Sequence, residues 1–436
     1  MLGPDPSEED TAGMRFSQRT NWNTEETDLA RAHRERVLAG LPLADLTASN
    51  PTRCGFHYPD LLDALRNPRA LEYDPNPRGL LAAREAVCAY YRDHGASVDP
   101  DQVILTTSTS EAYSFVFRLL CDPGDAVLVP TPSYPLFDFL ADIQDVKLAR
   151  YELVYDHGWQ IDPESLFDGA DRAIAAGARP RAVLAVQPNN PTGHFTRPWE
   201  ARELAALCRD HGLSLIVDEV FLDYAFPSVL PPSAALSRKG GEPGTQPSPT
   251  AVAGTFAAGL EDIPVFAVSG LSKICGLPQM KAAWIVATGP QRTPALDRLE
   301  VIADTFLSMN APVQWAMPQW LAARGEIKSQ ILDRVTANLA ELDRQLAAEP
   351  VVRRLAVEGG WYAVLRIAAL QSDDKTVRQL LDRGVWVHPG HFFGMPPSGW
   401  MVLSLLTPVN EFRTGVTRIL DTLGTHQEGN GTVGAA

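Results

Sequence analysis

Short, continuously apolar runs alternate with longer helix-like stretches over much of this chain, and that alternation constrains the fold more than any other feature. Each run lies close to turn residues, and the stretches Glu111–Leu120 and Trp199–His211 have the character of helices. Strands that are apolar along their whole length belong to sheets covered on both faces, which are mostly parallel sheets with crossover helices. The sequence therefore predicts an α/β fold, with strands at Val103–Leu105, Ala126–Val129, Ala182–Val186, Leu213–Val217, Val265–Val268 and Ala283–Ala287.

A second, smaller unit is predicted to follow the parallel sheet. From Arg292 to Ala348 the chain is mainly helical in character. The segments Trp361–Arg366, Val385–His388 and Val402–Leu405 then have the composition of strands. Helices and strands in this order indicate a smaller α+β domain.

Three segments of low complexity interrupt or flank these units. Residues 1–14 and 426–436 are rich in Gly, Ser, Glu or Thr, and we expect both to be disordered. Residues 227–250 concentrate proline and glycine, so they cannot form the interior of a helix or a strand. We favour a surface insertion for this stretch, and the alternative is a flap beside the active site.

The bulk composition excludes several classes of function. The chain has 436 residues and a formal net charge of −15, so it lacks the basic surface that nucleic-acid binding uses. It has no run of 18 apolar residues, so no membrane span is expected. Its start lacks the basic-then-apolar order of a secretory signal. The cysteines lack paired spacing and the histidines lack ligand spacing, which predicts a cytoplasmic protein with reduced thiols and no metal site.

Polar motifs directly follow three of the predicted strands. They are Gln187–Gly193, Ile216–Tyr224 and Ser269–Lys281. In a parallel sheet, ligands bind at the carboxyl ends of the strands, so these motifs are expected to converge on one pocket. An asparagine, an aspartate and a lysine that meet there would suit a charged aromatic cofactor.

Each of these residues also has a purely structural interpretation. Asp218 could cap the helix that follows it, and Asn189–Asn190–Pro191 could be only a turn. Lys273 could be one surface lysine among many. The three motifs together, each after a strand, favour a site over coincidence.

In these motifs the chain resembles the class I and II aminotransferases, the fold-type-I enzymes that use pyridoxal 5'-phosphate. Its differences from the family pattern resemble those of a divergent member. The resemblance extends from about Leu46 to Leu423. It implies a mostly parallel, seven-stranded sheet in a large domain and a smaller α+β domain. The boundaries we expect are an N-terminal arm with part of the small domain at 15–70, the large domain at 71–310 and the C-terminal small domain at 311–425.

The resemblance assigns roles around the cofactor ring. Lys273 would hold the cofactor as a Schiff base and later move a proton. Asp218 would pair with the pyridinium nitrogen and keep the ring an electron sink. Asn190 would bind the ring hydroxyl, and Tyr134 would stack on the ring face.

A phosphate site is expected beside the ring. Ser108, Thr109 and Ser110 precede a predicted helix, where backbone amides and hydroxyls bind anions, although the same residues would also make an ordinary helix cap. By resemblance, Ser272 and Lys281 would complete this site. Tyr73 matches a tyrosine that reaches the phosphate of the partner subunit, which implies a homodimer with shared active sites.

The chain departs from the family at four positions. Phe221 replaces a tyrosine that binds the ring hydroxyl, and Lys281 replaces an arginine that binds the phosphate. Ser108 replaces a glycine at the phosphate turn. Val402 replaces the arginine that holds the substrate carboxylate, and valine cannot make that bidentate bond.

Another residue must therefore hold the carboxylate, or the substrate presents a different group. Arg53, beside Asn50 in the segment expected to cover the substrate, and His391 are our first candidates. Further candidates are Arg78, Arg366 and His388.

Transamination of an amino acid is the favoured function. The departures at Phe221, Lys281 and Val402 keep a second possibility open: elimination, replacement, cyclisation or carbon–carbon bond formation, for example γ-chemistry on an S-adenosylmethionine-like substrate. A regulatory protein is disfavoured, because no segment large enough for a helix-turn-helix domain precedes residue 46. A Rossmann dehydrogenase is disfavoured, because no Gly-x-Gly-x-x-Gly motif follows a strand.

Overall fold

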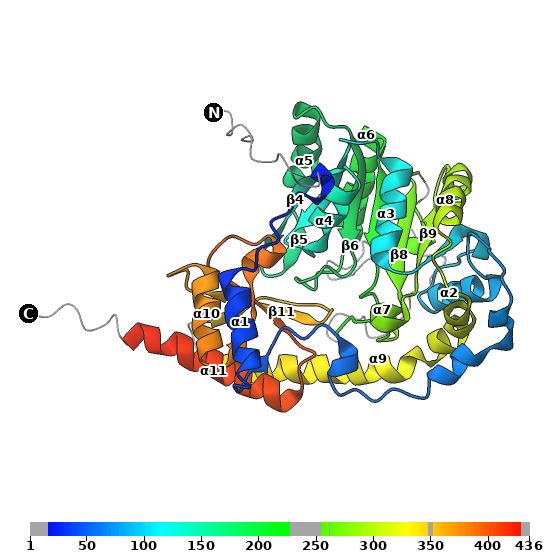
Figure 1. Cartoon of the computed structure of the whole chain (residues 1–436). Helices are drawn as coiled ribbons and strands as arrows, with labels where there is room; N and C mark the ends of the chain where they lie inside the picture. Colours follow the sequence, from blue (N-terminus) through cyan, green and yellow to red (C-terminus); the bar gives the residue numbers. More distant parts are fainter. Residues whose placement is uncertain (1–15, 227–253, 261, 348–351, 429–436) are drawn as a thin grey trace, which may run out of the picture.

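The computed structural model describes residues 16–226, 254–260, 262–347 and 352–428. A large sheet with helices on both faces forms one domain, and a smaller sheet with α1 (Asp28–Leu38), α10 (Asp373–Asp382) and α11 (Val409–Glu428) forms another (Figure 1). The long helix α9 (Ala311–Leu346) runs along the edge of both domains. The fold class predicted from the sequence is confirmed.

The large sheet has the strand order β2-β9-β8-β7-β6-β3-β4-β5. Strands β4, β3, β6, β7 and β8 pair in parallel, whereas β9 is antiparallel to both of its neighbours. All six predicted strands are present, as β2 (Val103–Thr106), β3 (Ala126–Thr131), β6 (Pro180–Val186), β7 (Ser214–Asp218), β8 (Val265–Gly270) and β9 (Ala283–Thr288).

The expected number of strands was wrong: the large sheet has eight strands instead of seven. Strand β4 (Lys147–Tyr155) has exposed charged residues at Lys147, Arg150 and Glu152, which interrupt its apolar residues. The short strand β5 (Trp159–Ile161) pairs antiparallel with β4 at the edge of the sheet and forms the eighth strand.

Burial on both faces explains why the central strands are apolar throughout. On β6, Ala182, Leu184 and Val186 pack toward one face. That face is covered by α3 (Thr109–Leu120), α4 (Leu136–Ile143) and α8 (Arg292–Phe306). Val183 and Ala185 pack toward the other face, against α5 (Pro163–Ala175) and α6 (Pro198–His211).

The smaller domain contains an antiparallel sheet of order β10-β11-β14-β13. Its strands are β10 (Val352–Arg354), β11 (Tyr362–Ile367), β13 (His388–Pro389) and β14 (Trp400–Ser404). The predicted strand at 385–388 is divided between β13 and β12 (Val385–Trp386), and β12 pairs in parallel with β1 (Ala44–Asp45). Three helices cover this domain: α1 (Asp28–Leu38), α10 (Asp373–Asp382) and α11 (Val409–Glu428).

Helix α9 belongs to both domains. Its beginning, including Met317 and Trp320, packs with α2 (Leu81–Asp93) in the large domain. Its later residues, including Ile331 and Val335, pack in the core shared with the small domain. A boundary placed at residue 311 therefore falls at the start of an element that joins the two domains.

The segments predicted to be disordered or inserted fall largely outside the described residues. This is true of 1–14 and 227–250. Helix α11 extends to Glu428, so the first residues of the expected 426–436 tail are helical and the rest lie outside the described part. Within the described residues, no helix has the length and apolar character needed to cross a membrane.

Candidate active site

The three polar motifs meet at one edge of the large sheet. Strands β6, β7 and β8 are neighbours, and their register pairs Val186 with Asp218 and Asp218 with Val268. Asn190 lies in the loop after β6, and Lys273 lies in the short helix that directly follows β8. Parallel neighbours end at the same edge, so the sheet topology brings together the three residues singled out from the sequence.

Lys273 lies in the short helix α7 (Leu271–Ile274), among aromatic rings. Its Nζ is 4.8 Å from the ring centroid of Trp361 and 5.6 Å from that of Phe221. The Tyr224 hydroxyl donates a 2.6 Å hydrogen bond to the Lys273 carbonyl and fixes the backbone. Removal of the amine from water lowers the pKa of Lys273 to about 8, although the charge of Asp218 opposes this shift. A lysine amine of this kind is available as a nucleophile near neutral pH.

Asp218 is buried at the end of β7 and is held by two donors. The Tyr113 hydroxyl donates to its Oδ2 at 2.6 Å, and the Val220 backbone N–H donates to its Oδ1 at 3.0 Å. Burial raises the pKa of Asp218, whereas these hydrogen bonds and the charge of Lys273 act in the opposite direction. The carboxylate is therefore oriented and faces a single cationic partner.

Phe221 lies beside Lys273, and Asn190 follows β6 in the chain. The Asn190 side chain is buried, and its Oδ1 has no hydrogen-bond partner among the described residues. Phe221 packs against Trp361, with ring centroids 5.3 Å apart, and offers no hydroxyl. Tyr224 does not replace the missing family hydroxyl, because its own hydroxyl is bound to the backbone of Lys273.

Ser108 is the N-cap of α3, which shows that the predicted phosphate segment does act as a helix cap. Its side chain accepts a hydrogen bond from the Glu111 N–H. Thr109 and Ser110 are the first residues of the helix, so their own N–H groups have no intrahelical acceptor. Such groups bind anions. The cap therefore leaves N–H groups of this segment available to an anion.

The remaining predicted phosphate ligands lie at the ends of short elements. Ser272 is partly buried in α7. Lys281 is exposed and has φ = 52°, in the left-handed region. Its ammonium group has a long, flexible stem, whereas the arginine usual at this position has a rigid fork.

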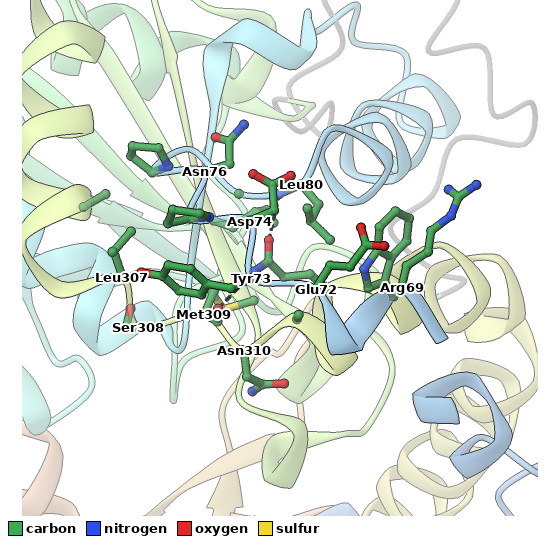
Figure 2. Close-up of a pocket in the computed structure, with 18 of the residues that line it drawn as sticks. Arg69, Glu72, Tyr73, Asp74, Asn76, Leu80, Leu307, Ser308, Met309 and Asn310 are labelled. Carbon is green, nitrogen blue, oxygen red and sulfur yellow. Dashed lines mark hydrogen bonds between the residues drawn. The ribbon is translucent and has the colours of Figure 1, made fainter. Parts of the chain in front are cut away.

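Tyr73 lies away from Lys273, in a surface pocket of about 320 Å³. Figure 2 shows its ring beside Leu307 and Ser308, in the link between α8 and α9. The side chain of Tyr73 is 84% exposed. Ser308 also donates a hydrogen bond to Glu111 at the start of α3, so one wall of this pocket adjoins the cap segment.

The basic candidates for the carboxylate differ widely in their surroundings. Arg78 pairs with Glu300, and Arg366 lies over the Trp400 ring and donates to two backbone carbonyls, so both are engaged elsewhere. His391 lies 3.6 Å from Asp374, in a recess of the small domain. Arg53 is exposed.

Two further candidates have more specific positions. Asn50 caps a short 3-10 helix by accepting hydrogen bonds from Thr52. His388 lies directly opposite Val402 in the register of β13 and β14.

The sequence interpretation missed three aromatic residues of the site: Tyr113, Tyr224 and Trp361. Tyr113 is on the inner face of α3 and contacts Asp218 only through the packing of that helix on the sheet. Trp361 comes from the small domain, so no local pattern connects it to Lys273. The one signal for it in the sequence is the pair Gly359–Gly360 directly before it. Glycines at such a position indicate that another backbone segment, here that of Tyr224, comes close.

The described residues fit pyridoxal 5'-phosphate. The buried Oδ1 of Asn190 has no hydrogen-bond partner among these residues, and the amine of Lys273 has a lowered pKa. Helix α3, whose Tyr113 binds Asp218, has at its start free N–H groups of the kind that bind anions. Among the described residues, no cluster of three or more acidic, histidine or cysteine side chains could hold a metal ion.

Comparisons with known proteins agree with this geometry. The glutamate-pyruvate aminotransferase AlaA of Haemophilus influenzae is 24% identical over 404 residues, which cover 89% of this chain and 92% of that protein. Nicotianamine aminotransferase 1 of Oryza sativa subsp. japonica is 27% identical over 63% of this chain and 51% of its own length.

Solved structures share the fold. An alanine aminotransferase from Pyrococcus furiosus superposes with a TM-score of 0.79 at 22% identity, over 94% of this chain and 100% of that chain. A single mutant of Thermus thermophilus aspartate aminotransferase gives a TM-score of 0.75 at 23% identity, with the same coverage of both chains. The family model for aminotransferase class I and II matches residues 57–419. The chain belongs to the class I and II aminotransferase family and is a transferase dependent on pyridoxal 5'-phosphate.

Proposed function

We propose that this enzyme transfers an amino group from an amino acid to a 2-oxo acid, with Lys273 as the residue that binds the cofactor covalently. The observation that carries the proposal is the Lys273 amine, whose pKa is lowered to about 8 and which lies beside the oriented carboxylate of Asp218. The names of the relatives support it, because they are aminotransferases.

The cofactor supplies an electron sink when bound. Side chains of the protein would bind the cofactor ring, orient it and transfer the proton. Asp218 would hold the ring nitrogen protonated, and Tyr113 keeps that carboxylate in place. The amine of Lys273 would act as the base that takes a proton from the α-carbon of the substrate and as the acid that gives it back. Asn190 would bind the ring hydroxyl without help from position 221, because Phe221 has no hydroxyl group.

The test measures release of the 2-oxo acid without any acceptor present. The enzyme is mixed with a panel of amino acids that includes S-adenosylmethionine. A transaminase releases one equivalent of 2-oxo acid per active site and then stops until an acceptor is added. Continued turnover without an acceptor, with release of ammonia or a sulfur leaving group, would instead assign elimination or replacement chemistry.

Covalent attachment is tested separately. Borohydride reduction followed by mass spectrometry of the digested protein should find the cofactor on Lys273. The Lys273→Ala variant should lose both this adduct and oxo-acid release. An adduct on another lysine would contradict the assignment.

We also propose a homodimer with shared active sites. The support is Tyr73, which is 84% exposed, and its neighbour Leu71, which is 91% exposed. Such a pair of large apolar side chains is typical of a covered surface. The five cysteines are all unpaired, which supports a reducing compartment, the cytoplasm.

A further inference from the structure

We propose that Asp223 is a positioning residue for Lys273, which it reaches through Tyr224. Asp223 anchors the loop at 219–226 to helices α2 and α9, and the Tyr224 hydroxyl extends this anchorage to the backbone of Lys273. The inference rests on the proposed function, because it concerns the lysine that would bind the cofactor. It concerns a buried ion cluster that takes no direct part in the proposed reaction.

Asp223 is a buried carboxylate with partners on two helices. Its side chain is completely buried. The Lys328 ammonium of α9 donates to its Oδ1 at 3.1 Å, and the Tyr90 hydroxyl of α2 donates to its Oδ2 at 3.0 Å. His94, at the end of α2, lies 3.5 Å from Oδ1. Burial raises the pKa of Asp223, but His94 and Lys328 outweigh burial and lower that pKa to about 2. The carboxylate is therefore charged at neutral pH.

This cluster leaves the loop little freedom to shift. Removing one partner from a buried ion pair leaves an unpaired charge, which is strongly unfavourable. The partners of Asp223 come from α2 and from α9, the helix that packs in both domains. The loop is therefore fixed relative to the frame of the large domain and to the element that joins the two domains.

Asp223 lies between two residues that contact Lys273. The Phe221 ring centroid is 5.6 Å from the Lys273 amine, and the Tyr224 hydroxyl donates to the Lys273 carbonyl at 2.6 Å. The Tyr224 N–H also donates to the Phe221 carbonyl at 2.9 Å, so one turn contains all three loop residues. A displacement of Asp223 would therefore move both contacts of Lys273.

The effect of Asp223 on Lys273 is one of position and not of charge. Burial, and after it the charge of Asp223, raises the pKa of Tyr224, so this hydroxyl stays protonated and remains a donor. The amine of Lys273 responds instead to its own burial, which lowers its pKa, and to the charge of Asp218, which raises it. The two routes predict opposite results when Asp223 loses its charge.

The rate of cofactor uptake by the cofactor-free enzyme tests the inference, because its pH midpoint reports the environment of the Lys273 amine. Asp223→Asn should raise the midpoint by about one pH unit, since a displaced amine is less desolvated. Loss of a nearby negative charge alone would lower the midpoint. Lys328→Met should also raise it, whereas Lys328→Arg keeps the cation and should leave it in place.

A double variant tests the route through Tyr224. Tyr224→Phe should raise the midpoint as Asp223→Asn does, and the two substitutions together should raise it little further, because they interrupt one connection. Two shifts that add in the double variant would show that Asp223 acts by another route, and they would overturn the inference.

Asp125→Asn is the matched control. Asp125 is also a buried carboxylate, paired with Arg179 at 2.9 Å and Arg181 at 3.4 Å, and it directly precedes β3, away from the carboxyl ends of the strands. This variant should lose stability in urea without a change of midpoint. The inference is overturned if Asp223→Asn lowers the midpoint or leaves it unchanged, or if Asp125→Asn moves it equally.

Lys328→Met keeps the test decisive even if Asp223→Asn does not fold, because the Lys328 side chain is 35% exposed. An unchanged midpoint in that variant would also overturn the inference. None of these results depends on release of an oxo acid. Borohydride reduction before the comparison identifies the lysine that carries the cofactor, so a failure of the proposed function would be recognised separately.

Discussion

The amine of Lys273 lies among rings rather than among charges. Trp361 and Phe221 exclude water from it, and Asp218 is the one charged group that acts on its pKa, which falls to about 8. An ordinary lysine titrates near 10.4. We therefore expect the rate of cofactor uptake by the cofactor-free enzyme to rise with pH through a midpoint of about 8, because the neutral amine is the nucleophile.

Stopped-flow absorbance from pH 6.5 to 10 would measure this midpoint. Replacing Trp361 with Gln should move it upward, since a polar side chain admits water and relieves the desolvation of the amine. A midpoint near the ordinary lysine value in the unmodified enzyme would contradict the desolvated environment described here.

Tyr113 is a positioning residue for Asp218, and removing its hydroxyl should change the pKa of Asp218 in a predictable direction. Burial raises the pKa of Asp218, and the Tyr113 hydrogen bond lowers it. Tyr113→Phe should therefore raise this pKa further and shift the acid limb of kcat/KM to higher pH. The Asp218 carboxylate should lose about 1.5–3 kcal/mol of stabilisation, the usual contribution of a hydrogen bond to a charged group.

Tyr155→Phe is a suitable comparison for that variant. Its hydroxyl accepts a hydrogen bond from the Ala356 backbone, away from Asp218. It should leave the acid limb in place. If both variants move the limb alike, Tyr113 has only a packing role.

At the scale of elements, a loop before β11 joins the two domains. The Phe226 N–H donates to the Glu358 carbonyl, Glu358 pairs with Arg197, and Ala225 forms a bridge with Gly359. A Cβ on Gly359 would lie 2.7 Å from Phe195 and would also meet the Tyr224 carbonyl. Because the Tyr224 hydroxyl binds the Lys273 carbonyl, this loop links the small domain to the backbone of Lys273.

Gly359→Ala should destabilise the protein by about 1–3 kcal/mol, the usual cost of overpacking. Urea unfolding would measure it, and binding of the cofactor should weaken in parallel. A stable Gly359→Ala variant would show that the loop has room to shift.

Gly325 in α9 differs from Gly359, because an added methyl group would meet open space there. It is exposed in the helix interior, and a Cβ there would have no neighbour within 4 Å. Gly325→Ala should stabilise the protein by about 0.5–1 kcal/mol, because alanine loses less backbone freedom in a helix. Unchanged or lower stability in urea would mean that α9 does not limit global unfolding.

At the scale of the molecule, dimerisation and cofactor binding should be linked. Leu71→Asp places a charge beside Tyr73 on the surface proposed to meet the partner. We expect it to weaken the dimer in analytical ultracentrifugation and to weaken cofactor binding at the same time. Leu370→Asp is the control, since Leu370 is also exposed, at 72%, but lies in the small domain. Dimer loss without cofactor loss would argue against shared sites.

Much of the large sheet could be predicted because its central strands are buried on both faces. That burial requires continuous apolar runs, so β3, β6, β7, β8 and β9 are visible in the sequence. Strand β4, next to the edge strand β5, is exposed along part of its length and carries Lys147, Arg150 and Glu152. A pattern of that kind is not distinctive, and β4 and β5 were missed.

The sequence by itself determined the chemistry of the site: Asn190, Asp218 and Lys273 each follow an apolar strand, and parallel strands must end at one edge. Only the tertiary structure decided what surrounds them. Tyr113 reaches Asp218 across a helix–sheet interface, and Trp361 reaches Lys273 across a domain interface. Contacts of this kind depend on packing between elements distant in sequence, and local residue patterns carry no information about that packing.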